Sequence, residues 1–447
     1  MPPRTTPDAP PGSARTRAVV CAAFLAVHAV YWFFAITDPG VGYGDVGLYQ
    51  YWAWDGLENG VWPVLDFPWV YPALALVPVT LPGLVSTLEW EPYMAGWLAL
   101  VTALNALATV ALVRRAWLGA IWWIAFLAFL GPVAFGRIDA IIVPLAIGGL
   151  LLAAQRPRVA AVLLTVGAWI KVAPGALVVP LFAVARRRWR DVVVPAAAVC
   201  VAVIGLVAAG GGLRHVASFA SAQEGRGLQL ESVAASWWVA SWITGGDAEG
   251  VYNEELITWE IMGPGTVVAA DLLGWLLPLV AGALCLLVWR ARGRLADAEL
   301  LAWSGLALML ALIVTNKVGS PQFYAWVAAP VAVGLAGWAR GGDDGETRAD
   351  DEKVPDDGLR GWPGWLDWPL VAVWALVIAG LTHRIIPVGY FELVAGEAFV
   401  GWLLVARNVL ALGLFALAVA RLIAVGPRTA VRQRPAVGPR PAADRPA

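Results

Sequence analysis

The chain has 447 residues, of which 60% are hydrophobic and only 14% are charged, and its formal net charge is -1. Soluble globular proteins carry about 25% charged residues, so this composition excludes an ordinary soluble domain. A net charge near zero, without a basic groove, also argues against a nucleic-acid partner. Uncharged runs near the ~20 residues needed to cross a bilayer recur along the chain, and they predict an all-α polytopic membrane protein.

The predicted elements begin after a proline-rich, polar lead at residues 1–16, which we expect to be disordered and cytoplasmic. A membrane domain is predicted over residues 17–425. Its first span is Ala18–Thr37, and the arginines before it place the N-terminus in the cytoplasm by the positive-inside rule. The remaining spans, which bring the expected number to eleven to thirteen, are Tyr71–Leu88, Tyr93–Val113, Trp117–Phe135, Ala140–Ala154, Val159–Ala185, Asp191–Ala209, Pro264–Trp289, Ala298–Val314, Pro321–Ala339, Trp368–Ile386 and Ala398–Ile423.

Basic clusters set the orientation of these spans. Arg186–Arg190 and Arg290–Arg294 are predicted to be cytoplasmic, as are a mixed-charge, disordered loop at 340–364 and a disordered, basic, proline-rich tail at 426–447. Four polar stretches are then outside, at 38–70, 210–262, 315–320 and 381–397. A conflict remains for Arg114–Arg115 and Arg156–Arg158, because their charge indicates the cytoplasm while a strict count of spans puts both outside.

The first external loop contains a carboxylate among glycines and aromatic residues, in GYGDVGLYQYW at 42–52. Asp45, Tyr49 and Trp52 are spaced i, i+4 and i+7, so they share one face if this stretch is helical. Asp66 follows, shortly before the Tyr-Pro pair that opens the next predicted span. A wet interfacial loop whose aspartate caps a helix explains the stretch as well as a catalytic site does.

Two further charged positions interrupt apolar runs. Arg137 and Asp139, in FGRIDAIIVPL, form either a local ion pair in a polar turn or part of a site, since unpaired charge is costly at membrane depth. Lys171 lies where KVAPG breaks an apolar segment, and broken helices occur where backbone lines a cavity. A lysine there suits a lipid phosphate, although it could also snorkel from the end of a span.

Three later segments carry polar groups on the external side. In EGRGLQLESVAASWW (224–238), Arg226 and Glu231 belong to a predicted glycine-rich turn that leads into an amphipathic surface helix. TNKVGSPQFYAW (315–326) places Lys317 and Gln322 at a helix start that suits an anion. The other polar groups are His383 and Arg384, which end one span, and Arg407, which is buried within the last span and needs a partner or water.

The order of these motifs resembles glycosyltransferase family 87, the polyprenyl-phosphate-mannose-dependent α-mannosyltransferases common in actinobacteria, within the GT-C membrane glycosyltransferases. The resemblance rests on the Asp45–Tyr49 pair, LDFPWVYPALA, GRIDA, WIKVAPGALVVPLF ending in RRRWR, RGLQLES and SPQFYAW. It implies a GT-C fold whose first external loop carries short interfacial helices. It also implies inverting transfer of a sugar, expected to be mannose, from a polyprenyl-phosphate donor to a glycolipid or lipoglycan hydroxyl, outside the plasma membrane.

The resemblance also implies roles for individual residues. Asp45 matches the general base of the family. The cationic and polar candidates for the donor phosphate are Lys171 and Arg384 foremost, then Arg226, Lys317, His383 and Gln322; the supporting residues are Tyr49, Asp66, Arg137, Asp139 and Glu231. No cofactor is expected, and without an Asp-x-Asp pair in the first loop no metal is predicted. This chain has Gly136-Arg137 where the family often has Gly-Gln.

The alternative is a multi-pass transporter or a flippase for a lipid-linked sugar. Such proteins often show internal repeats and polar residues at mid-membrane on several spans. No repeat is visible here, although Arg407 mildly favours this alternative. A structural scaffold would explain the spans but not the polar residues gathered on one side.

Overall fold

The computed structural model describes residues 13–221, 225–346 and 366–425. The predicted disordered lead and tail therefore lie almost entirely outside the described residues. Of the predicted loop at 340–364, only the first part is described, and it continues a helix to Glu346.

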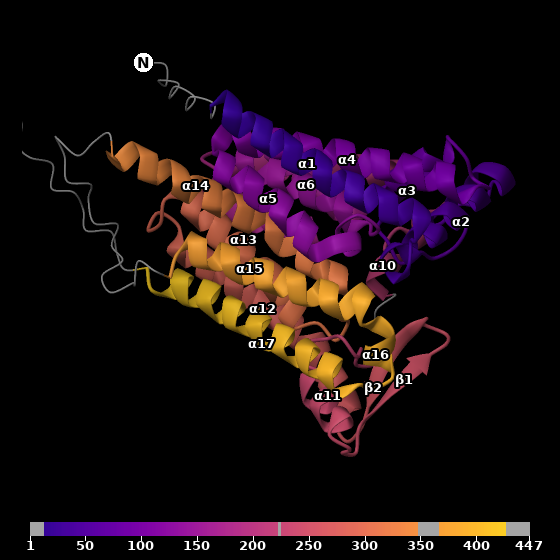
Figure 1. Ribbon diagram of the computed structural model, residues 1–447. Helices are drawn as coiled ribbons and strands as arrows, with labels where there is room; N and C mark the ends of the chain where they lie inside the picture. Colours follow the sequence, from indigo (N-terminus) through magenta and orange to yellow (C-terminus); the bar gives the residue numbers. More distant parts are fainter. Residues whose placement is uncertain (1–12, 222–224, 347–365, 426–447) are drawn as a thin grey trace, which may run out of the picture.

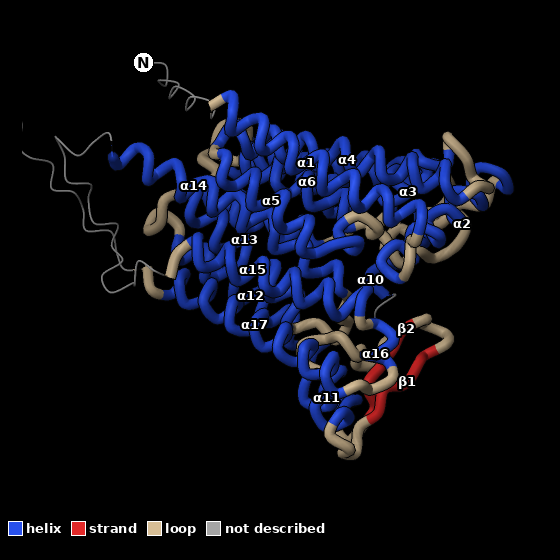
Figure 2. Tube along the Cα trace, in the orientation of Figure 1, coloured by secondary structure: helices blue, strands red, loops and turns tan. Residues whose placement is uncertain are grey.

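The described residues form a bundle of long antiparallel helices with smaller elements at one end (Figures 1 and 2). The helices are α1 (Ala14–Thr37), α2 (Gly44–Asn59), α3 (Leu76–Gly83), α4 (Trp90–Arg115), α5 (Trp117–Leu130), α6 (Asp139–Leu152), α7 (Pro157–Ile170), α8 (Val178–Val184), α9 (Val194–Ala209), α10 (Ser218–Ser221), α11 (Ser236–Ile243), α12 (Thr266–Ala291), α13 (Asp297–Val314), α14 (Ala328–Glu346), α15 (Trp368–His383), α16 (Tyr390–Val394) and α17 (Ala398–Ile423). Short 3-10 or π segments are η1 (Val41–Tyr43), η2 (Ala73–Ala75), η3 (Gly131–Ala134), η4 (Ala173–Leu177), η5 (Trp189–Val193), η6 (Leu213–His215), η7 (Pro321–Val327) and η8 (Arg384–Val388).

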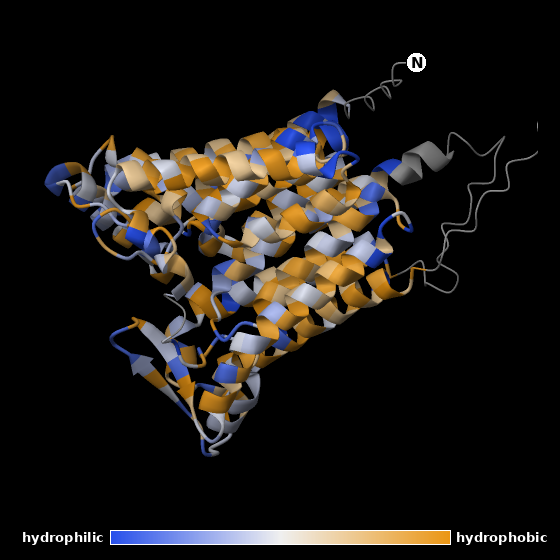
Figure 3. Cartoon of the chain, turned by 180° about the vertical axis from the view of Figure 1, so that it is seen from behind, coloured by the Kyte–Doolittle hydropathy of each residue, from blue (hydrophilic) through white to orange (hydrophobic). Residues whose placement is uncertain are grey.

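The fold class predicted from the sequence is confirmed. Within the described residues, 8 helical segments are long and apolar enough to cross a membrane, and four apolar helical segments are shorter, at 73–83, 139–152, 157–170 and 173–184. The expected eleven to thirteen spans are reached only if most of these shorter segments also cross. Coloured by hydropathy, the bundle is apolar along its length, and the polar residues gather at its two ends (Figure 3).

Burial distinguishes central helices from peripheral ones. In α13, 78% of the apolar window is buried, whereas the value is 17% both for α12 and for the span that contains α9. The buried rings of Trp303 and Trp368, with centroids 4.4 Å apart, pack the N-terminal parts of α13 and α15 together. The outer helices α9 and α12 therefore present most of their apolar surface to the surroundings, as lipid-facing helices do.

The bundle has two distinct ends (Figure 1). We call the one where α1 begins and α17 finishes the terminal end, and the one that carries α2, α11, α16 and the strands the loop end. Side-chain contacts fix the antiparallel pairing of α1 and α4: His28 bonds Asn105 at 3.2 Å, and Trp32 bonds Thr102 at 3.0 Å. Arg114 and Arg115, at the C-terminal end of α4, thus lie beside the start of α1.

Two predicted spans are wrong in detail. Tyr71–Leu88 does not cross, because it holds only η2 and the eight-residue α3, which packs on α2 at the loop end. Val159–Ala185 is not one broken span but a hairpin: α7 runs toward the loop end, the chain reverses through η4, and α8 returns. The ion pair of Arg158 with Asp191, 2.8 Å from Nε to Oδ1, requires this reversal because it joins the start of α7 to η5.

These two corrections remove the conflict over the basic clusters. With Tyr71–Leu88 left uncrossed and α7 and α8 counted separately, the clusters at Arg114–Arg115, Arg156–Arg158, Arg186–Arg190 and Arg290–Arg294 all lie at the terminal end. The four polar stretches predicted to be outside meet at the loop end.

A small antiparallel sheet, which the all-α prediction did not include, lies at the loop end. β1 (Glu249–Asn253) pairs with β2 (Thr258–Met262), with Glu249 opposite Met262. The segment before α11 adds to its edge, since Leu230 N donates to Trp259 O and Ile261 N to Leu228 O. Residues 225–235 are therefore irregular and strand-paired, and the amphipathic helix predicted there begins only at α11.

Candidate functional site

The loop after α1 folds back at η1 and starts α2, which confirms the helical reading of GYGDVGLYQYW. Asp45 lies in the first turn, where a carboxylate favours the helix dipole, and Tyr49 and Trp52 are buried one and two turns later. The Asp45 side chain remains 30% exposed. The helix thus anchors itself by its aromatic face and leaves its carboxylate accessible.

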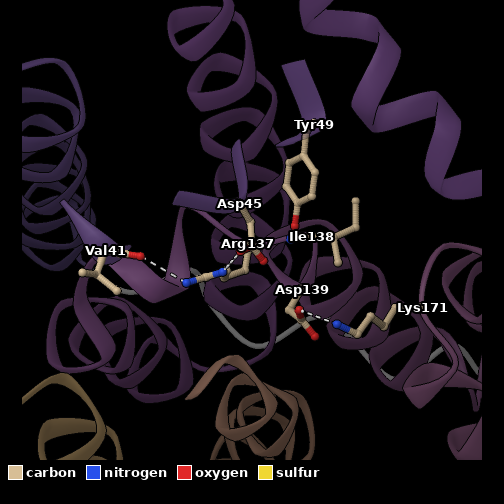
Figure 4. Close-up of polar contacts among 7 residues, drawn as sticks. All are labelled: Val41, Asp45, Tyr49, Arg137, Ile138, Asp139 and Lys171. Carbon is tan, nitrogen blue, oxygen red and sulfur yellow. Dashed lines mark hydrogen bonds and ion pairs between the residues drawn. The ribbon is translucent and has the colours of Figure 1, made fainter. Parts of the chain in front are cut away.

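Asp45 points at the guanidinium of Arg137, with which it forms an ion pair (Figure 4). Arg137 also donates from Nη2 to the Val41 carbonyl at 3.1 Å. The Tyr49 hydroxyl accepts a hydrogen bond of 3.0 Å from the Ile138 backbone N–H. Three contacts therefore fasten the GRIDA turn to η1 and α2, so Arg137 and Asp45 belong to one unit rather than to separate polar turns.

A second ion pair lies beside the first. Asp139 begins α6, is fully buried, and accepts from Lys171 Nζ at 3.2 Å and from Trp326 Nε1 at 2.5 Å. Lys171 Nζ lies over two aromatic rings, 5.3 Å from the Tyr71 centroid and 5.4 Å from that of Phe323. Lys171 at the α7–α8 reversal thus meets the carboxylate of Asp139 from α6 and three aromatic rings. Two of these rings come from η7, and the third, Tyr71, comes from the segment before η2.

Tyr71 connects these two ion pairs. Burial raises the pKa of its phenol; the nearby cation Lys171 opposes this rise and the Asp45 carboxylate adds to it. Burial also raises the pKa of Tyr49 well above its usual value, with Tyr71 and Asp45 adding to the effect. Since one phenol is influenced by both charges, we treat the two pairs as one site, the Asp45–Lys171 cluster, made of Asp45, Tyr49, Tyr71, Arg137, Asp139 and Lys171.

Arg226 reaches the same region from the loop before α11. Burial lowers the pKa of its guanidinium, while Glu260 and the Tyr71 phenol act in the opposite direction. The neighbouring Gly227 N–H donates to Glu260 Oε1 at 2.8 Å, so the strand β2 holds this turn in place. Arg226 is thus a cation outside the two ion pairs that is influenced by a member of the cluster, Tyr71.

Glu231 belongs to a network that joins the same loop to α17. Arg407 donates from Nη2 to the Glu231 carbonyl at 3.0 Å, and the adjacent Asn408 donates to the Ser232 carbonyl at 3.1 Å. The Tyr324 hydroxyl donates to Asn408 Oδ1 at 3.1 Å. Arg407, which the sequence left as a possible membrane-embedded site, is thereby accounted for as the residue that holds the loop onto the bundle.

The Glu231 carboxyl, unlike its backbone carbonyl, is not fully hydrogen-bonded. Its Oε2 is buried without a hydrogen-bond partner among the described residues. Burial raises the pKa of this carboxyl to about 7, against the opposing influence of Arg407 and Arg137. Glu231 is held beside α17 by Arg407, and Arg137 of the Asp45–Lys171 cluster is among the charges that act on its carboxyl.

Other predicted site residues have different partners. Arg384, in η8, pairs with Glu392 at 3.2 Å, and the His383 ring packs against Gly131. Asp66 Oδ2 accepts from the Trp62 N–H at 2.7 Å within its own turn. The carbonyl of Lys317 accepts from Gln229 N at 3.0 Å. Gln322, next to Phe323, is buried, and its Oε1 has no hydrogen-bond partner among the described residues.

The sequence reasoning missed Tyr71 and Trp326 as site residues. Both stand in motifs that were singled out, LDFPWVYPALA and SPQFYAW, but aromatic residues near span ends are usually interfacial anchors. Their roles depend on Lys171 and Asp139 arriving from other helices. In the part of the chain that the structure describes, no group of three or more His, Cys, Asp or Glu is placed to hold a metal ion.

Comparison with known proteins decides the family. Residues 69–315, more than half of the chain, match glycosyltransferase family 87. The chain belongs to glycosyltransferase family 87. This confirms the family identified from the sequence motifs and makes the protein a membrane glycosyltransferase. The match includes Tyr71, Asp139 and Lys171 of the cluster, whereas Asp45 precedes it.

The chain is also similar to two solved structures of ArnT from Cupriavidus metallidurans. The apo structure has 15% sequence identity and a TM-score of 0.45, and the alignment covers 92% of this chain and 78% of ArnT. The structure of ArnT bound to undecaprenyl phosphate has 18% identity and a TM-score of 0.44, covering 91% and 79%. No curated protein matches the chain.

Proposed function

We propose that this family 87 glycosyltransferase moves a mannosyl group from a polyprenyl-phosphate donor to a hydroxyl of a glycolipid or lipoglycan acceptor. The observation that carries the proposal is the partly exposed Asp45 carboxylate, held by Arg137 beside the Asp139–Lys171 pair. A carboxylate and a lysine next to each other at one end of an apolar bundle suit a substrate with a phosphate head and a hydrocarbon tail. The transfer needs both groups, because a carboxylate can take the proton of the acceptor while a lysine can bind the leaving phosphate.

In this reaction Asp45 acts as the general base. As the acceptor oxygen attacks the anomeric carbon, Asp45 takes its proton, and the bond from that carbon to the phosphate oxygen breaks on the opposite side. The configuration at the anomeric carbon is therefore inverted. Arg137 binds Oδ1 of Asp45 and fixes the direction in which the carboxylate faces. Base catalysis of this kind contributes about 10²–10⁴-fold to the rate.

The leaving phosphate needs cations, since negative charge develops on it as the sugar departs. Lys171 and Arg226 both neighbour Tyr71, and we assign the donor phosphate to the region between them. Asp139 pairs with Lys171 and is itself bonded by Trp326, so it sets the position of the lysine. Arg384 is a further candidate, because η8 packs against η1, which leads into α2.

The loop end is proposed to face the extracytoplasmic side of the plasma membrane. The basic clusters at Arg114–Arg115, Arg156–Arg158, Arg186–Arg190 and Arg290–Arg294 all lie at the opposite, terminal end. Such an asymmetry supports a cytoplasmic position for the terminal end, where α1 begins and α17 finishes. The donor and acceptor would then meet outside, where lipid-linked sugars are used.

The test is sugar transfer by membranes that contain Asp45→Asn. With radiolabelled polyprenyl-phosphate mannose, we expect the rate to fall by about 10²-fold or more, because an amide cannot accept the proton. Asp55→Asn is the matched control, since Asp55 lies on the same helix and its carboxylate accepts a hydrogen bond of 3.1 Å from Asn59 Nδ2 within that helix. Full activity in Asp45→Asn would overturn the assignment of the base. Transfer from a different polyprenyl-phosphate sugar, but not from the mannose donor, would overturn the choice of mannose alone.

A further inference from the structure

An apolar groove lies on the outside of the bundle and extends from Gly175 in η4, the turn that follows Lys171, to Trp289 near the C-terminal end of α12. It has a volume of about 540 Å³ and is bordered by α8, by η5 with α9, and by α12. Small side chains make room for it: Gly175, Ala196, Ala197 and Cys200 on one side face Cys285 on α12, and Trp289 closes one end. Because α9 and α12 are mostly lipid-facing, the groove is reached from the surrounding membrane.

Two arginines meet at the Trp289 end of this groove. The Cζ atom of Arg188 lies 5.0 Å from the centroid of the Trp289 ring, and that of Arg292 lies 4.1 Å from it. Arg188 also lies over Phe182, a groove residue, at 6.0 Å. Both cations therefore lie against one indole at the mouth of an apolar channel, at the terminal end of the bundle.

Neither guanidinium is fully paired. Arg188 Nε and Arg292 Nη1 are buried and have no hydrogen-bond partner among the described residues. The nearest acidic neighbour in sequence, Asp191, is engaged by Arg158. Two like charges beside one ring repel each other, and a buried donor without an acceptor is unfavourable. An anion placed between them would relieve both.

The residues that line the groove indicate the chemical class of that anion. Guanidinium groups bind phosphate through paired hydrogen bonds, and tryptophan is typical of the depth at which lipid head groups lie. Beyond the arginines the groove is apolar, so a free phosphate would leave it empty. We propose that this groove binds an anionic phospholipid, with its phosphate on Arg188 and Arg292 and an acyl chain along α9 and α12.

The length of the groove agrees with a phospholipid. From Val192 to Cys200, the groove residues of η5 and α9, the helical rise is about 12 Å, which fits within one leaflet, about half of the ~30 Å hydrocarbon thickness. The phosphate end lies with the basic clusters of the terminal end, whereas the donor phosphate is assigned to Lys171 near the loop end. The proposed lipid is thus distinct from the glycosyl donor and does not depend on the proposed function.

The experiment compares anionic and neutral lipid on purified protein. Adding phosphatidylglycerol, but not phosphatidylcholine or inorganic phosphate, is expected to raise the Tm of the wild-type protein in mild detergent. In Arg188→Gln/Arg292→Gln, we expect the amount of co-purified phosphatidylglycerol, measured by mass spectrometry, to fall about tenfold, and the Tm shift to disappear. Arg187→Gln/Arg290→Gln removes the same charge from exposed neighbours and is the matched control.

A second variant tests the groove independently of the charges. Ala196→Trp fills the groove and keeps both arginines, and it should abolish lipid retention and the Tm shift as well. Equal retention in Arg188→Gln/Arg292→Gln and wild type would overturn the proposal, as would an equal loss in the Arg187→Gln/Arg290→Gln control. Retention of a polyprenyl phosphate in place of phospholipid would also overturn it, because the groove would then belong to the donor.

Discussion

At the scale of single residues, Asp139 is the most constrained charge of the site. It is fully buried, and its two oxygens take Lys171 at 3.2 Å and Trp326 at 2.5 Å. A buried ion pair that loses one partner leaves an uncompensated charge, which costs about 3–5 kcal/mol. The pair is therefore a structural requirement of the site as well as part of the proposed donor-binding region.

We expect Asp139→Asn to lower the Tm of the purified protein markedly, because Lys171 keeps its charge without an anion. Adding Lys171→Met should recover much of that Tm and still leave donor binding weak. Asp191→Asn is the control: its partner Arg158 is half exposed, and ion pairs near the surface are worth only about 0–1 kcal/mol. If the double variant were no more stable than Asp139→Asn alone, the charge argument would fail.

The buried carboxyl of Glu231 predicts that the stability of the protein depends on pH. Its carboxyl has a pKa of about 7 in the folded protein against 4.5 for the ordinary group, so the folded state holds the proton more tightly than the unfolded state. Linkage then requires that Glu231 lowers the free energy of unfolding as pH rises from about 4.5 to about 7. Above that window the loss is complete.

Thermal unfolding in detergent between pH 4.5 and 7.5 measures this contribution. Glu231→Gln cannot titrate, so its Tm should fall less with rising pH over that range than the wild-type Tm does. Glu249→Gln, in the exposed strand β1, removes a carboxylate of the same loop without an expected effect. Parallel curves for wild type and Glu231→Gln would show that the burial of Glu231 does not govern this titration.

At the scale of elements, the sequence predicted helices well and their ends poorly. The i, i+4, i+7 spacing identified α2, and the charges of GRIDA marked the start of α6. The α7–α8 reversal was not predicted, because KVAPG is compatible both with a kink and with a turn. What decides between them is the Arg158–Asp191 pair, a contact between residues far apart in sequence.

The sheet at the loop end was missed for a similar reason. Each of its strands has only five residues, and a pair of strands that short is marginal by itself. It forms here because residues 228–230 add to its edge and Arg407 and Asn408 fasten the following turn to α17. Arg407 and Asn408 lie on α17, far away in sequence, and hydrophobic periodicity does not predict such contacts. The sequence therefore identified Arg226 and Glu231 as candidates, but it could not predict which groups surround them.

At the scale of the whole molecule, the site depends on the direction in which each helix runs. The basic clusters group the polar stretches at one end of the bundle although two of the predicted spans are wrong, because charge is interpreted locally whereas errors in a count of spans accumulate along the chain. Tyr71–Leu88 was counted as a span although it does not cross, and Val159–Ala185 was counted as one span although it is a hairpin of two helices. The count therefore assigned the segments between them to the wrong end of the bundle. In the structure Lys171 lies beside Asp139 because α7 and α6 are antiparallel neighbours.

Gln155, between α6 and α7, distinguishes the two arrangements. A strict count of the predicted spans puts it outside, together with the Asp45 loop, whereas the structure places it at the terminal end. In a chain with Cys21, Cys200 and Cys285 replaced by alanine, we expect Gln155→Cys and Gly293→Cys to react with a membrane-impermeant maleimide only after cells are opened. Asn59→Cys and Asp247→Cys, at exposed positions of the loop end, should react in intact cells. Labelling of Gln155→Cys together with Asn59→Cys would mean that α7 and α8 are not a hairpin in the membrane, and Lys171 could not then lie at the donor phosphate.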